Sequence, residues 1–233
     1  MKKRFLVNCV AFTLAEVLIT LVIIGVIAAI TIPNLSKKWR DHADVVKVKE
    51  AYSILSNAYK MALAENGPME SWDWPAPNGS YSSANYDYFG SVLSKYLKVQ
   101  KYCGHNRGCF DAVYFKKVTS GDYTSIGLLR DQHGKMILAN GMRLFIDINN
   151  PRYMDNSHIF VDINGAKGPN RFGYDAFTIP IRSYGLDIKS NSVGSVSDCN
   201  PTKNSNGIGM SCINWIMRKG NMDYKYRDVS AEW

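Results

Sequence analysis

The feature that most constrains this chain is an apolar run near its start. From Phe12 to Ile32 the sequence has 21 residues and one charge, that of Glu16. At about 1.5 Å per residue, a helix over this run is ~31 Å long, which matches the hydrocarbon core of a bilayer. Basic residues tend to stay on the cytoplasmic side, so the leader Lys2-Lys3-Arg4 predicts a single membrane pass with the rest of the chain outside the cytoplasm.

Glu16 is the exception within this run, and its presence needs an explanation. A carboxylate at the centre of a membrane helix costs about 2.5–3.5 kcal/mol, and less near an end. Glu16 lies close to the cytoplasmic end of the run, so it can reach headgroup water while the chain is a monomer in the membrane. Inside a protein assembly it would instead need a cation beside it.

The residues around Glu16 resemble the N-terminus of prepilins, the precursors of type IV pilins and of type II secretion pseudopilins. The shared pattern is a basic leader, a small residue, Phe-Thr-Leu-x-Glu and a long apolar run that ends near Pro33. The resemblance implies that a prepilin peptidase cleaves between Ala11 and Phe12 and methylates the new Phe12 amine. It also implies that Glu16 pairs with the Phe12 amine of a neighbouring subunit in a helical filament. The family usually has Gly before the cut, so Ala11 is expected to slow cleavage.

The same resemblance implies a division of the chain and a location for the protein. The helix is expected to loosen between Gly25 and Pro33 in a filament, and both residues are weak helix formers. The protein is expected in a bacterial inner membrane, and then in a pilus or pseudopilus with other pilins. The expected segments are a removed leader (1–11), a membrane and filament-core helix (12–33), an amphipathic continuation (34–66) and a globular head (67–233).

Other readings of the N-terminus fit the sequence less well. A secretory signal would end in an A-x-A cleavage site after the apolar run, and Ala28-Ala29-Ile30 does not supply one. A plain signal anchor remains open, but it leaves Glu16 unexplained.

Charge and cysteine content agree with an exported domain. The net charge of +8 is scattered, so contact with nucleic acid is permitted but not indicated. Of the five cysteines, Cys9 lies in the leader, and four remain for a compartment where disulfides persist. Three pairings are possible, and we favour the local one. It joins Cys103 to Cys109 and Cys199 to Cys212.

The remaining periodicity predicts an α+β fold, with a long N-terminal helix packed on a small antiparallel sheet. An apolar stripe from Val45 to Ala62 continues the first helix to about Glu65, and Asn66-Gly67-Pro68 ends it. Residues 68–90 are expected to form a long loop whose aromatic side chains either cover the sheet or form a binding surface. A short helix is expected over Val92–Leu97 and another over Ser211–Arg218. The predicted strands are Val113–Lys117, Ser125–Leu129, Lys135–Leu138, Arg143–Ile148, Ile159–Ile163 and Phe177–Ile181. The near-identical segments at 144–149 and 159–164 are expected to be neighbours in the sheet.

One exported segment, from Asp162 to Asp175, carries oxygen ligands at close spacing. Asp162, Asn164 and Asp175 could turn oxygens toward one point, as Ca²⁺ requires. The segment resembles loops of pilin-like proteins, but it is not an EF-hand. The alternative, which the residue types favour, is that Asp and Asn cap their own turns by hydrogen bonds.

The sequence contains no pattern that indicates an enzyme. It lacks the Gly-x-Ser-x-Gly, Gly-x-Gly-x-x-Gly, phosphate-loop and His-Glu-x-x-His motifs. The expected function is therefore that of a structural filament subunit. The alternative is a minor tip pilin that acts as an adhesin or binds DNA.

Overall fold

The computed structural model describes most of the chain, in two compact units that divide between Asp41 and His42. The predicted strands Val113–Lys117 and Ser125–Leu129 lie outside the described residues, as does the leader. The described residues are 12–78, 82–105, 133–151, 157–188, 199–200, 209 and 212–232.

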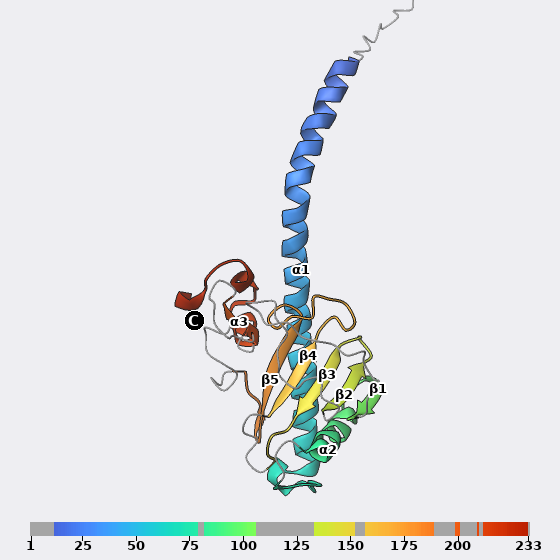
Figure 1. Ribbon diagram of the computed structural model, residues 1–233, viewed down its shortest axis with the longest axis vertical. Coiled ribbons are helices and arrows are strands. Elements are labelled where there is room, and N and C mark those ends of the chain that lie inside the picture. Colours follow the sequence, from blue (N-terminus) through green and yellow to red (C-terminus); the bar gives the residue numbers. More distant parts are fainter. Residues whose placement is uncertain are drawn as a thin grey trace, which may run out of the picture. The chain divides into compact units, whose positions relative to one another are not determined.

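Helix α1 extends over 53 residues, from Leu14 to Asn66 (Figure 1). Its bounds agree with the predicted helix to within two residues. Pro33 lies inside it, so the missing N–H of the proline costs one hydrogen bond without ending the helix. Gly67, at φ +79°, follows the last helical residue and reverses the chain in the left-handed conformation that favours glycine.

In the first unit, the apolar side chains of α1 are exposed. Among the described residues, α1 is the helix that is long and apolar enough to span a membrane. Polar side chains within and just beyond the apolar run bond to the helix's own backbone carbonyls, which satisfies them without water. These bonds are Thr20 to Val17, Thr31 to Ile27, Asn34 to Ile30 and Ser36 to Ile32.

The second unit contains a six-stranded antiparallel sheet whose spatial order follows the order of the chain. In Figure 1 the strands follow one another across the sheet from β1 to β5. The strands are β1 (Val99–Gly104), β2 (Gly134–Leu138), β3 (Arg143–Asp147), β4 (His158–Asp162), β5 (Ala176–Arg182) and β6 (Gly185–Leu186).

The four predicted strands that fall on described residues are present, and the two near-identical segments are neighbours. In the β3–β4 pair, Leu144 lies opposite Val161 and Ile146 lies opposite Ile159. Strands β1 and β6 were not predicted. β1 has three exposed residues in a row and no clear alternation, and β6 is only two residues long.

The core lies between one face of the sheet and the second half of α1. The buried stripe of α1 includes Val48, Leu55 and Tyr59, as its periodicity predicted. Helix α2 (Ser83–Ser94) packs on β1 and β2. This corrects the prediction of a loop to residue 90 and a helix over 92–97. The α+β fold class is confirmed.

The aromatic residues after α1 belong to this core. Trp72 and Trp74 are 6% and 8% exposed, and their rings stack on Phe89 of α2. The ring of Tyr59 meets Trp72 and Phe89 edge-on. The two tryptophans thus cover the core, so their rings are not a surface for binding DNA or another ligand.

Candidate functional site

The start of α1 is held by a reciprocal pair of bonds between Thr13 and Glu16. The backbone N–H of Glu16 donates to Thr13 Oγ1 over 3.2 Å. In return, Glu16 Oε2 accepts the backbone N–H and the hydroxyl of Thr13, each at 2.8 Å. This is a capping box, which satisfies N–H groups that the first turn of a helix leaves without partners.

The capping box fixes the position of the Glu16 carboxylate. Oε2 accepts both bonds from Thr13, whereas Oε1 accepts no hydrogen bond from the described residues. Phe12, whose amine the predicted cleavage would release, directly precedes Thr13 and is exposed. One carboxylate oxygen therefore remains available to a donor from another molecule, next to an exposed apolar surface.

The two predicted loosening positions, Gly25 and Pro33, both lie within the continuous α1. A Cβ at Gly25 would meet nothing within 4 Å, so no neighbouring group requires glycine there. The loosening of this segment in a filament stays a prediction.

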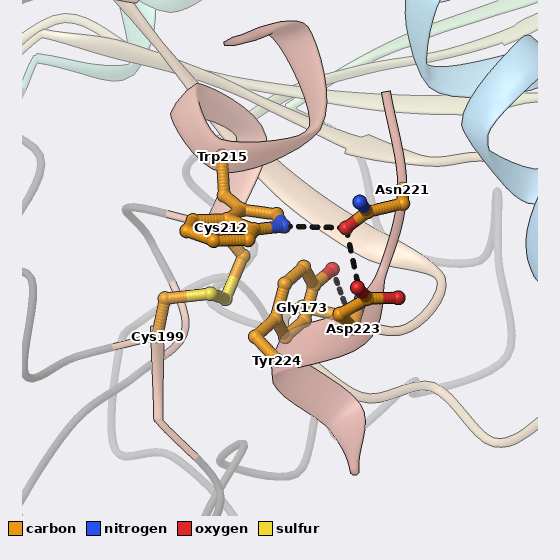
Figure 2. The surroundings of a disulfide bond; sticks show 7 residues. All are labelled: Gly173, Cys199, Cys212, Trp215, Asn221, Asp223 and Tyr224. Carbon is orange, nitrogen blue, oxygen red and sulfur yellow. Dashed lines mark hydrogen bonds between the residues drawn. A yellow bond between two sulfur atoms is a disulfide. The ribbon is translucent and has the colours of Figure 1, made fainter. Parts of the chain in front are cut away.

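The predicted bond between Cys199 and Cys212 is present and joins the start of α3 (Cys212–Lys219) to residues 199–200. Figure 2 shows Trp215 and Tyr224 beside it. The Trp215 indole donates to Asn221 Oδ1 over 2.8 Å, and the Tyr224 hydroxyl donates to the Gly173 carbonyl. The disulfide ties the C-terminal segment to Cys199, the Trp215 bond holds that segment together, and the Tyr224 bond ties it to the turn that precedes β5.

Only one cysteine of the other predicted pair lies among the described residues. Cys103, in β1, is disulfide-bonded. Its predicted partner, Cys109, lies in the range 106–132, outside the described residues.

The segment from Asp162 to Asp175 forms turns that its own carboxylates cap. Asp162 Oδ1 accepts the backbone N–H groups of Asn164 and Gly165 at 3.1 and 3.0 Å. Asp175 accepts the N–H groups of Asn170 and Arg171, and the Asn164 amide donates to Asp175 over 3.0 Å. The turn-capping alternative therefore describes the observed bonds, and Asn164 and Asp175 are in direct contact.

The same segment leaves oxygen atoms without donors. Asp162 Oδ2, Asn164 Oδ1 and Asn170 Oδ1 are buried and have no hydrogen-bond partner. The pKa of Asp162 is raised to about 7, mainly by burial and also by the nearby Asp175 carboxylate, while hydrogen bonds from Asn164 and Gly165 and the charge of Arg143 oppose the rise. Burial also raises the pKa of Asp175. Three buried acceptor oxygens, one of them on the Asp162 side chain, are therefore left without donors in this segment.

Two residues of these sites were missed from the sequence. Thr13 begins a Thr-x-x-Glu pattern, which is the sequence form of a capping box and could have been found. Asn170 follows Gly168-Pro169 and has φ +51°, a conformation that Asn adopts more readily than most residues. Its neighbours in the sequence alone did not predict that its backbone N–H bonds to Asp175.

No group of three or more His, Cys, Asp or Glu side chains in the described part of the chain is placed to hold a metal ion. A metal in the Asp162–Asp175 turn would thus need amide as well as carboxylate oxygens.

Comparison with known proteins gives no information about these sites. They are therefore interpreted from the sequence and structure of this chain. No protein-family model matches the sequence, and neither a curated protein nor a solved structure shows significant similarity to it.

Proposed function

We propose that this protein is a structural subunit of a type IV pilus-like or type II secretion filament, held in the inner membrane before assembly. The observation that carries the proposal is the exposed apolar helix from Phe12 to Ile32, with a single carboxylate fixed near its start. A helix that exposes apolar residues all round is stable only in lipid or among other apolar helices.

Assembly would bury this helix among copies of itself. In lipid, the Glu16 carboxylate near the headgroups is tolerated, but between packed helices it needs a cation. The methylated amine of Phe12 on a neighbouring subunit supplies that cation, and Oε1 is the oxygen that the capping box leaves for it. The ion pair would then set the axial register of one subunit against the next.

Replacing Glu16 tests this mechanism. Glu16→Ala is expected to insert in the membrane at wild-type levels, because the helix becomes more apolar, but to yield far fewer filaments. The control is Thr20→Ala, which removes a polar group one turn further along without removing a charge. Normal filament yield from Glu16→Ala would reject the ion-pair mechanism.

Mass spectrometry of the protein from its own cell tests the identity of the mature N-terminus. The proposal requires a chain that begins with methylated Phe12. A chain that begins at Met1, or one trimmed beyond Pro33, would remove the basis for a filament.

We propose calcium binding by the Asp162–Asp175 turn as a second property of the protein. The three buried oxygens without donors support it, since Ca²⁺ takes carboxylate and amide oxygens in flexible geometry. A buried water that donates to the same atoms would satisfy them equally.

A thermal melt distinguishes the cation from the water. The full chain in detergent micelles is melted with Ca²⁺, with Mg²⁺ and with a chelator, beside the variant Asp162→Asn. A melting temperature that rises with Ca²⁺ in the wild type only is the expected result. Equal melting temperatures with Ca²⁺ and chelator would leave the turn-capping role alone.

A further inference from the structure

The stretch of α1 just beyond the apolar run combines apolar and basic side chains. Leu35 and Trp39 are 58% and 68% exposed. Lys37, Lys38 and Arg40 are exposed as well, and none of them forms an ion pair with a described residue. We call these five residues the outer band.

The helix sorts these residues onto different sides. Leu35 and Trp39 are four residues apart, so they share one face. Lys37 and Arg40 are three apart and share the opposite face, whereas Lys38 lies between that face and Leu35. A helix segment with an apolar face that includes Trp and a basic face is typical of the membrane–water interface.

The depth of the outer band matches the headgroup layer. Lys37 lies five residues beyond Ile32, or about 7.5 Å along the helix. Headgroups add roughly 5–8 Å to each side of the hydrocarbon core. Side chains on a helix point toward its N-terminus, which here is the membrane side, so the basic side chains and the Trp39 ring extend back into this layer.

The basic residues of the outer band lie on the side that lysine and arginine usually avoid. The leader has three cations before the helix, and the outer band has three after it. Cations on the translocated side weaken the signal for the proposed orientation. A binding partner on that side accounts for their presence.

We propose that the outer band binds the headgroups of anionic phospholipids in the outward-facing leaflet of the membrane that α1 spans. Three cations without protein partners complement a negative lipid surface, and Trp39 anchors the segment at the level of the glycerol backbone. The inference rests on the proposed function, because it requires the helix to cross a bilayer. It adds a lipid preference that would hold the subunit at a fixed depth until it is extracted into a filament.

Quenching of Trp39 by brominated lipids tests the preference. The full chain is reconstituted in phosphatidylcholine vesicles that contain a minor fraction of brominated phosphatidylglycerol or brominated phosphatidylcholine. The signal of Trp39 is the difference between the wild type and Trp39→Phe. We expect quenching about threefold or more stronger with the anionic lipid, falling as salt is raised.

The triple variant Lys37→Gln, Lys38→Gln, Arg40→Gln should lose the preference and keep ordinary quenching. The matched control Lys60→Gln, Lys95→Gln, Lys167→Gln removes the same charge from exposed positions in the second unit and should behave as the wild type.

The outcomes separate this inference from the proposed function. Equal quenching by the two lipids in the wild type would place the helix in the bilayer and reject the lipid preference. Absence of quenching by either lipid would show that the helix does not cross the bilayer as proposed, and the filament proposal would fail with it. If the triple variant kept the preference for the anionic lipid, the outer band would not be its cause. The cations of the outer band would then be assigned to contacts between copies of the chain.

Discussion

The hydroxyl of Tyr59, on α1, donates a hydrogen bond to the carbonyl of Arg182, at the end of β5, over 2.7 Å. Tyr59 is fully buried, and burial raises the pKa of its phenol well above the usual range, so the group stays a donor at any ordinary pH. The bond links the helix to a strand 123 residues later in the chain.

Removing this hydroxyl should weaken the second unit. Tyr59→Phe removes the hydrogen bond to the Arg182 carbonyl and keeps the ring, so we expect a loss of about 1–2 kcal/mol in the free energy of unfolding. Urea denaturation of the full chain in micelles measures it. Tyr52→Phe is the control, because the half-buried Tyr52 makes a longer bond of 3.3 Å to the Leu186 carbonyl, and its loss should cost less. An equal loss in both variants would contradict the argument.

The capping box predicts that Thr13 supports assembly through Glu16. Thr13→Val keeps the shape of the side chain and removes both hydroxyl bonds, which should fray the first turn by about 1 kcal/mol and lower the filament yield. Thr13→Ser retains the hydroxyl and should assemble normally. Yield in the sheared fraction, normalised to the amount in the membrane, is the measurement. Normal assembly of Thr13→Val would show that Glu16 acts without this support.

The disulfide predicts a local loss of order when it is removed. A loop closed over a sequence separation of 13 contributes about 3 kcal/mol in the chain-entropy model. In Cys199→Ala, Cys212→Ala, hydrogen exchange should accelerate in α3, while the amides of β3 and β4 stay protected. Uniform acceleration in the sheet and α3 would instead mean that the bond stabilises the whole unit.

The buried Asp162 predicts a stability that falls as pH rises. Its pKa is raised from 3.8 to about 7 in the folded state, so between these values the folded chain holds a proton that the unfolded chain has lost. Unfolding then releases a proton, and the free energy of unfolding declines from about pH 4 to pH 7, by up to about 1.4 kcal/mol per pH unit. Denaturation at a series of pH values, with a chelator present, measures this decline.

Asp162→Asn should flatten much of that slope, with a remainder from Asp175. The control Asp73→Asn changes an exposed carboxyl and should keep the slope. If calcium occupies the turn, adding it should also flatten the slope in the wild type, because the cation holds Asp162 ionised. A slope unchanged in Asp162→Asn would reject this assignment.

Gly134, at the start of β2, is expected to tolerate no side chain. A Cβ there would lie 2.7 Å from the backbone carbonyl of Tyr86 in α2, which cannot move without displacing the helix. Gly134→Ala should lower the melting temperature by several degrees, corresponding to about 1–3 kcal/mol of overpacking. Gly168→Ala meets nothing within 4 Å and is the matched control. Equal melting temperatures of the two variants would contradict this contact.

The long-range pattern of the fold could be predicted from the sequence where periodicity is strong. Three features were predicted from patterns of nearby residues. They are the apolar stripe on α1, the alternation in β3 and β4, and the spacing of Cys199 and Cys212. The helix α2 could not be predicted in the same way. Its first residues, from Ser83 to Tyr88, are polar and aromatic, and only contact with β1, β2 and the tryptophans makes them helical.

The candidate sites also differ in how far local sequence patterns predicted them. The need for a cation beside Glu16 was inferred from a charge in an apolar run, and its pairing with the Phe12 amine stays a prediction from the prepilin resemblance. Thr13 belongs to a pattern of four residues. In the Asp162–Asp175 turn, however, the bonds depend on the backbone at Gly165 and Asn170, both of which have positive φ. The spacing of side chains in the sequence does not specify this backbone conformation. The capping bonds and the buried oxygens without donors could therefore be identified only from the structure.

The order of the sheet has a consequence for how the second unit acquires its structure. Each strand pairs with the strand that precedes it, so no pairing waits for a segment that has yet to emerge. A polypeptide that emerges N-terminus first, from a ribosome or a translocation channel, can therefore form its hairpins one after another. Cys199 and Cys212 follow β5 and β6 in the chain, so the link between them involves the last of these parts to emerge.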